Sequence, residues 1–222
     1  MIKNIFIILL YFAVAYGFAQ DAESKFTFDY YTVYNYKKTD ENSASIVKTV
    51  TYSNSKDSSY VLTIFIKNNE ALGIQLMDYT NNRRYEFEGN KNFFDLTDLN
   101  FLKTKYYRYF NLDYYRKKQK RYHEVDYSNQ EKGIVIVNKY KNKKRKKLLL
   151  KFIIETTPSE IAQNQHYNFP PLISPMWTNR FTLKNKEVIT RAYSEVNGSI
   201  SSMYQLEEIS KIDFTLTVNH TK

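Results

Sequence analysis

Hydrophobic and polar residues alternate along three consecutive segments between Ser58 and Leu96, as is typical of β-strands with one buried face. Asparagine-rich turns separate the three segments. The pattern therefore predicts an antiparallel meander whose apolar face must be covered by further strands or by a helix. The expected apolar positions, segment by segment, are Tyr60, Leu62, Ile64 and Ile66, then Leu72, Ile74 and Leu76, then Tyr85 and Phe87.

The same period of two recurs along the rest of the chain and predicts about ten strands in all. The first covers residues 26–38, with one aromatic face made of Phe26, Phe28, Tyr30, Tyr34 and Tyr36. The others are expected at 45–54, 103–118, 121–127, 133–140, 147–156, 187–196, 199–206 and 211–218. Asn197-Gly198 separates two of these strands and favours a type I′ hairpin turn.

Two short segments favour helix instead. Thr157 is a suitable N-cap, with Pro158 at the first helical position and Glu160 three residues after the cap, so a helix is expected to run to about His166. Residues 90–100 are expected to form a short helix or an irregular connection. The predicted fold class is mainly β: a single antiparallel meander sheet of about ten strands, curved into a half or closed barrel, with one or two short helices.

Residues 1–19 have the pattern of a signal peptide. Lys3 gives a short positive start, residues 5–15 are apolar, and Gly17 and Ala19 are small residues at the −3 and −1 positions of a cleavage site. We therefore expect export to the periplasm or to the extracellular space.

The expected product of cleavage is a single β-rich domain, residues 20–222. Mass spectrometry of the N-terminus should find Gln20, or its pyroglutamate form, as the first residue. An uncut leader on the exported protein would refute this prediction.

Recognisable catalytic chemistry is missing from the sequence. The chain has no cysteine, which excludes a cysteine nucleophile, and it carries no GxSxG, HExxH or glycine-rich phosphate loop. His123, His166 and His220 are scattered. We predict no catalytic residue, cofactor or metal site, and expect a noncatalytic protein that binds an apolar or amphipathic ligand or an envelope partner. An enzyme with an unrecognised site and a small outer-membrane β-barrel stay open as alternatives.

Positive charge is concentrated in one part of the chain. Residues 103–151 contain 17 lysines and arginines against 4 acidic residues, whereas the whole chain has 33 against 23. The two densest runs fall in predicted turns that should emerge at the same edge of the sheet. We predict that they form a rim that binds an anionic envelope polymer or a lipid head group. Its residues are Arg116, Lys117, Lys118, Lys120, Arg121, Lys143, Lys144, Arg145, Lys146 and Lys147.

Basic runs of this kind also arise without an anionic ligand. Lysines at hairpin tips can simply be solvated and discourage edge pairing, and an A+T-rich genome favours lysine codons. Tyrosines interleaved with arginines between Tyr106 and Arg116 suit base stacking, but export makes nucleic acid a poor candidate partner. The sequence does not define an oligomeric state.

Three segments resemble secreted β-rich proteins of Bacteroidota, including the GLPGLI group, some of which are similar in fold to periplasmic lipoprotein carriers: the leader ending in GFAQ, the turn and strand NSKDSSYVL, and the closing QLEEISKIDFTLTV. The GLPGLI motif is absent, and FPPLI at residues 169–173 is only reminiscent of it. The resemblance implies a curved antiparallel sheet with an apolar concave side, and it identifies no site residue.

Overall fold

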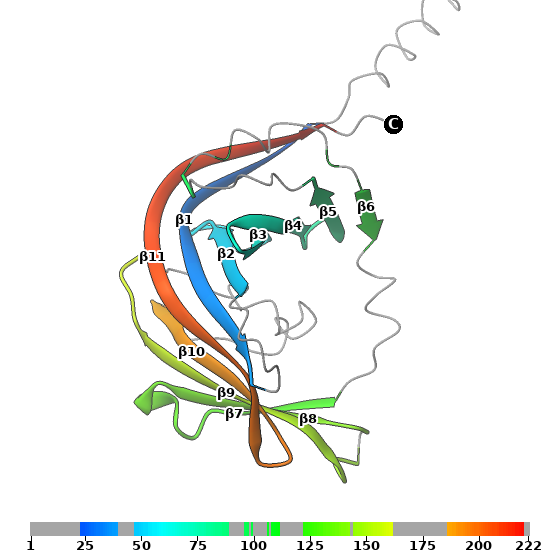
Figure 1. The fold of residues 1–222 in the computed structure, drawn as a ribbon, viewed down its shortest axis with the longest axis vertical. Helices are drawn as coiled ribbons and strands as arrows, with labels where there is room; N and C mark the ends of the chain where they lie inside the picture. The colour runs from blue at the N-terminus through cyan, green and yellow to red at the C-terminus, as the bar shows by residue number, and fades with distance from the viewer. Residues whose placement is uncertain are drawn as a thin grey trace, which may run out of the picture.

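Eleven antiparallel strands form one sheet in the computed structural model, which describes residues 23–39, 47–88, 96–97, 99, 106, 108–111, 122–142, 144–161 and 186–219 (Figure 1). This confirms the predicted mainly β fold and its antiparallel meander. A single turn of 3₁₀ helix, η2 (Gln130–Lys132), is the helical element of the described part. The strands are β1 (Glu23–Lys38), β2 (Val47–Ser53), β3 (Tyr60–Lys67), β4 (Glu70–Asp78), β5 (Arg83–Phe87), β6 (Arg108–Asn111), β7 (Tyr122–Asp126), β8 (Ile134–Tyr140), β9 (Leu148–Pro158), β10 (Glu187–Val196) and β11 (Ser199–Asn219).

The strand order is β6-β5-β4-β3-β2-β1-β11-β10-β9-β8-β7. Two meanders, β1–β6 and β7–β11, are therefore joined by pairing of β1 with β11. Among the described residues β6 and β7 do not pair, so the closed barrel, one of the two predicted forms, is wrong. Figure 1 shows β1 and β11 bending together along the left of the molecule, with β2–β6 to their right and β7–β10 at their lower end. The described residues include no helix long and apolar enough to cross a membrane.

The larger hydrophobic core lies on one face of β1–β5. Strand register places its residues directly opposite one another, and opposed side chains point to the same face. One row crosses five strands in order: Tyr31, Tyr52, Leu62, Leu76 and Tyr85. All five are buried. The buried faces predicted for β3 and β5 are thus confirmed.

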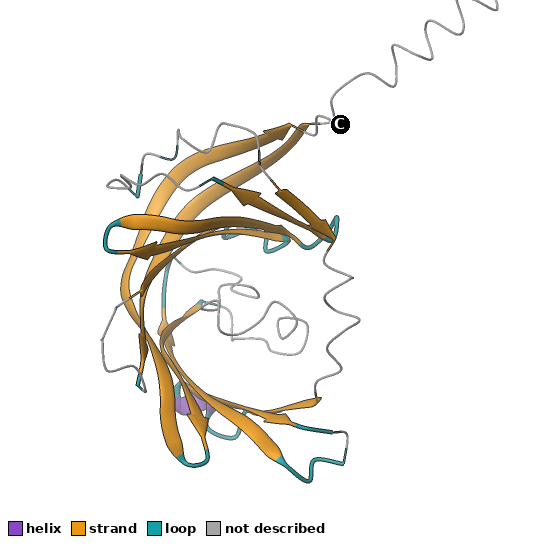
Figure 2. Cartoon of the chain, turned by 45° about the vertical axis from the view of Figure 1, so that its right-hand side comes forward, coloured by secondary structure: helices purple, strands orange, loops and turns teal. Residues whose placement is uncertain are grey.

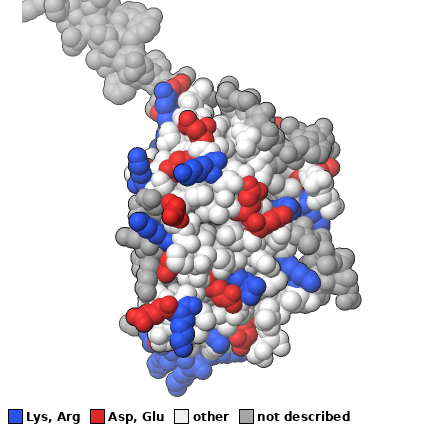
Figure 3. Space-filling view, turned by 90° about the vertical axis from the view of Figure 1, so that its left-hand side faces the viewer, with Lys and Arg blue, Asp and Glu red and all other residues white. Residues whose placement is uncertain are grey.

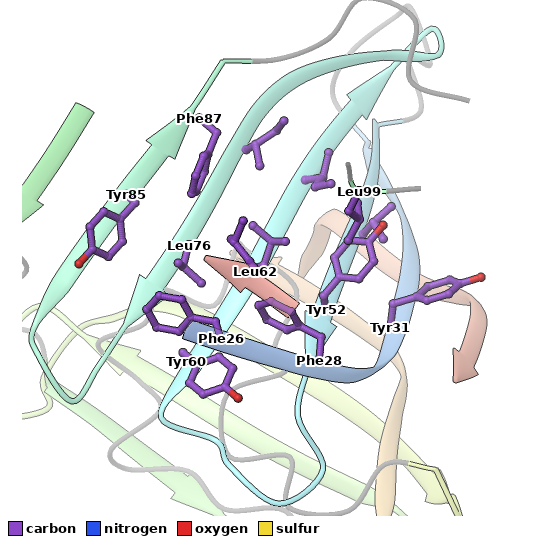
Figure 4. Close-up of a cluster of buried hydrophobic side chains, with 14 of the residues drawn as sticks. Phe26, Phe28, Tyr31, Tyr52, Tyr60, Leu62, Leu76, Tyr85, Phe87 and Leu99 are labelled. Carbon is purple, nitrogen blue, oxygen red and sulfur yellow. The ribbon is translucent and has the colours of Figure 1, made fainter. Parts of the chain in front are cut away.

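Strand β1 bends sharply after Phe28. Phe28 and Tyr31 belong to the same core although they are three positions apart, so the alternation of faces slips by one residue between them. Pairing with β2 begins only at Tyr30. Asp29 lies at the bend, and its carboxylate accepts a hydrogen bond from the Ser55 amide at 2.7 Å. The first residues of β1 consequently leave β2 and cross the core, and Figure 4 shows the two phenylalanines of β1 against side chains of β3 and β4.

This slip corrects the predicted aromatic face of β1. Three tyrosines of β1 do not share a face with Phe28: Tyr30, Tyr34 and Tyr36. The register with β2 is unbroken from Tyr30 onward, so these tyrosines point to the face of the sheet away from Tyr31. The Tyr34 hydroxyl donates to the Ile189 carbonyl at 2.9 Å, and burial raises the pKa of Tyr34. A second core lies on this other face: Tyr34, Val135, Val137, Phe152, Ile154, Ile189, Ala192 and Tyr204.

Leu72 was predicted to be buried with Ile74, and this is wrong. Phe65 pairs with Gly73 while Ile66 pairs with Ala71, so Leu72 is the extra residue of a β-bulge. Its side chain is 60% exposed. Ala71 packs against the core in its place.

Two further predictions fail at strand ends. Thr157 and Pro158 are the last residues of β9 and do not begin a helix. The two strands predicted at 199–206 and 211–218 are one continuous strand, β11, in which a register shift near Glu207 takes the place of the expected break. Other predicted features lie outside the described residues: the signal peptide, most of the segment 90–100, His166 and His220.

Candidate functional site

The described residues of the second basic run, Lys144 to Lys147, lie in the turn between β8 and β9. The Lys141 amide donates to the Lys147 carbonyl at 3.0 Å, and the Arg145 amide donates to the Asn142 carbonyl at 3.1 Å. Arg145 adopts a left-handed backbone with φ of 54°. These backbone hydrogen bonds close the turn of the predicted hairpin between β8 and β9.

One acidic residue, Glu124 of β7, holds the turn against the sheet. The Arg145 guanidinium donates to Glu124 Oε1 at 2.7 Å, and the Tyr140 hydroxyl donates to Glu124 Oε2 at 3.2 Å. Partial desolvation, together with this hydrogen bond, raises the pKa of Tyr140. Glu124 thus pairs with Arg145 in an ion pair that is largely exposed to solvent.

Three lysines that flank Arg145 differ from it in their surroundings. Lys144, Lys146 and Lys147 are exposed, and none of them forms an ion pair within the part of the chain that the structure describes. We call these three residues the basic tip. An anionic molecule can reach their charges without displacing a carboxylate of the described residues.

Strand register places the ends of other strands beside the basic tip. Lys151 of β9 pairs with Glu195, close to the turn between β10 and β11. Lys38, at the end of β1, pairs with Ser202 near the start of β11. Figure 2 shows the β8–β9 and β10–β11 turns together at the lower end of the molecule, and Figure 3 shows lysine and arginine side chains gathered at that end.

The other predicted rim residues are Lys143 and the whole first run, Arg116, Lys117, Lys118, Lys120 and Arg121, and all of them lie outside the described residues. The backbone at Tyr122 pairs with Tyr140, the last residue of β8. The start of β7 therefore lies beside the end of β8, and the common rim stays a prediction.

Exposed apolar side chains at this end were missed by the sequence reasoning. Leu148, Leu149, Val196 and Ile200 are 47%, 40%, 38% and 50% exposed, and they make up four of the six exposed large hydrophobic residues in the described part. Consecutive residues of a strand point to opposite faces. Two adjacent leucines directly after a lysine-rich turn therefore signalled that at least one would not reach a core.

No group of three or more His, Asp or Glu side chains in the described residues is arranged to hold a metal ion. Glu208 accepts hydrogen bonds from the hydroxyls of Tyr31 at 2.6 Å and of Ser210 at 2.8 Å, and these bonds lower its pKa. The Tyr31 bond links β1 to β11, whereas the Ser210 bond lies within β11.

No protein-family model matches the chain, and a search of curated proteins found none similar to it. The resemblance to secreted β-rich proteins consequently stays a prediction.

Proposed function

We propose that this protein is an exported, noncatalytic binding protein whose open sheet is a half barrel, and whose basic tip binds the anionic groups of an envelope molecule. One observation carries the proposal: Lys144, Lys146 and Lys147 are exposed on a hydrogen-bonded turn, while the nearby carboxylate of Glu124 is paired with Arg145. A lysine close to an anionic surface contributes about 1 kcal/mol of attraction. Three together give roughly 3 kcal/mol.

Protection of a sheet edge does not account for these lysines. Edge strands carry lysine to discourage pairing with other chains. The edge here is β7, however, and the β8–β9 hairpin lies inside it in the strand order. Backbone groups of both hairpin strands are already paired with neighbouring strands. The lysines at their turn are therefore not needed to prevent pairing of an exposed edge with another chain.

An apolar ligand inside the curve of the sheet has less support. The larger core is filled by its own rings: Phe28 lies 5.6 Å from Tyr60 and 6.0 Å from Phe214, measured between ring centroids. Such spacings are those of packed aromatic pairs. The anionic group of an amphipathic ligand is therefore better placed at the basic tip than in this core.

The test is retention on immobilised heparin, a soluble polyanion. The triple variant Lys144→Gln, Lys146→Gln and Lys147→Gln should elute at clearly lower salt than the wild type, with an affinity lower by roughly 100-fold. Charge attraction is screened over about 8 Å at physiological salt, so wild-type binding should also weaken steeply as salt rises.

A matched control removes the same charge elsewhere. Lys56, Lys132 and Lys211 are exposed and lie away from the basic tip. Changing all three to Gln should leave most of the retention. Equal losses from the two triple variants, both with unchanged circular dichroism, would show that only net charge matters and would contradict the proposal.

A further inference from the structure

The basic tip lies beside apolar side chains that a soluble polyanion would not contact. Leu148 and Leu149 follow the tip directly, and Val196 and Ile200 flank the neighbouring β10–β11 turn. Burying apolar area is favourable by about 25 cal/mol per Å². Leu148 and Leu149 point to opposite faces of β9, and Val196 and Ile200 to opposite faces of their hairpin. These four side chains therefore meet another apolar phase together only when it approaches the end of the sheet along the strands.

We infer that this end of the sheet docks on the surface of an anionic lipid bilayer, with the basic tip among the head groups and the four apolar side chains at the boundary of the acyl chains. The inference rests on the proposed function, since it names the molecule that carries the anionic groups. Two turns contact the bilayer in this arrangement: the β8–β9 turn through basic and apolar side chains, and the β10–β11 turn through apolar side chains.

Charge complementarity favours a membrane over other partners. Peripheral proteins bind anionic membranes through two signals, apolar side chains inserted at the interface and lysines attracted to head groups. The β8–β9 turn supplies both within the five residues from Lys144 to Leu148. Asn197 and Gly198 form a tight two-residue turn with positive φ, which places Val196 and Ile200 at the extreme end of their hairpin.

The experiment compares co-sedimentation with two kinds of vesicle, pure phosphatidylcholine and an equimolar mixture of phosphatidylcholine with phosphatidylglycerol. Wild-type protein should bind the anionic vesicles and not the neutral ones. The variant Leu148→Ser with Leu149→Ser should bind anionic vesicles on the order of tenfold more weakly. Its retention on heparin should match the wild type, because its lysines are unchanged.

Further variants test the β10–β11 turn by itself and control for the loss of an exposed apolar side chain elsewhere on the protein. Val196→Ser with Ile200→Ser should weaken vesicle binding and spare heparin retention. Leu72→Ser, at an exposed bulge outside this end of the sheet, should change neither. The basic-tip triple variant should lose both.

The outcomes distinguish the two proposals. If both apolar variants bind anionic vesicles as tightly as the wild type while heparin retention still depends on the basic tip, the partner is a soluble polyanion and the membrane inference is wrong. Absence of wild-type binding to vesicles of either composition would also overturn it. Heparin retention that does not depend on the basic tip would instead refute the proposed function.

Discussion

Replacing Phe28 with alanine is expected to lower the free energy of unfolding by about 3–5 kcal/mol, a large fraction of the stability of an ordinary domain. The ring is 1% exposed and packs against Tyr60, Phe214 and Tyr52, at centroid distances of 5.6, 6.0 and 6.4 Å. It also lies where β1 bends over the core. Its removal leaves a cavity that rings from three other strands cannot close without moving their backbones.

The measurement is chemical denaturation followed by circular dichroism, with Leu72→Ala as the control. Leu72 is a large hydrophobic residue too, but it is exposed at a bulge, so its truncation should change stability by less than about 0.5 kcal/mol. A denaturation midpoint of Phe28→Ala equal to that of the wild type would mean that the crossing of β1 over the core is misplaced.

The second large effect is expected at Gly133, which ends the 3₁₀ turn before β8. Its φ is +72°, and an added Cβ would lie 2.5 Å from the backbone oxygen of Thr156. That oxygen cannot easily move, because the Thr156 amide donates to the Gly133 carbonyl at 2.7 Å. Gly133→Ala should therefore cost about 2–5 kcal/mol, from a left-handed backbone and from overpacking.

Gly198→Ala isolates the backbone part of this cost. Gly198 has a φ of +82°, but apart from its two chain neighbours no atom of the described residues lies within 4 Å of the added Cβ. Only about 1–2 kcal/mol is expected there. Both substitutions reduce the freedom of the unfolded chain equally, so this contribution cancels in the comparison. Equal destabilisation of the two variants in the same denaturation assay would contradict the contact with Thr156.

Periodicity in the sequence predicted strands well wherever register is regular. The buried positions of β3 and β5 follow directly from alternation, and Asn197-Gly198 predicted its hairpin from turn chemistry alone. Alternation fails where an extra residue enters a strand. Leu72 and the even positions of β1 beyond Phe28 were misplaced because a bulge or bend depends on the partner strand, which local sequence does not specify.

At the end of β9, pairing with the neighbouring strand overrides a local sequence pattern that favours a helix. Thr157 and Pro158 have the residue types of a helix start, yet they pair with Val188 and Glu187 of β10. A proline is tolerated there because it ends the strand. Tertiary pairing decided the conformation at this position.

The candidate site was predictable only in part. A lysine run between two strongly alternating segments indicated a basic hairpin tip. Sequence could not show that Glu124 would pair with Arg145, since that contact joins a turn to another strand. Nor could it show that Val196 and Ile200 would lie at the same end, because that depends on β10 being the neighbour of β9.

Because β1 and β11 are neighbours at the centre of the sheet, the sheet can be completed only after the last strand of the chain has been synthesised. Each meander can form from neighbouring segments, but the pairing of Glu23 with Asn219 closes a loop of nearly the whole described chain. Contacts of such long range are slow to form because loop closure costs entropy before any contact is gained. Until β11 has been synthesised, the edge of β1 that will pair with it has no partner strand. The chain is most prone to aggregation during this period.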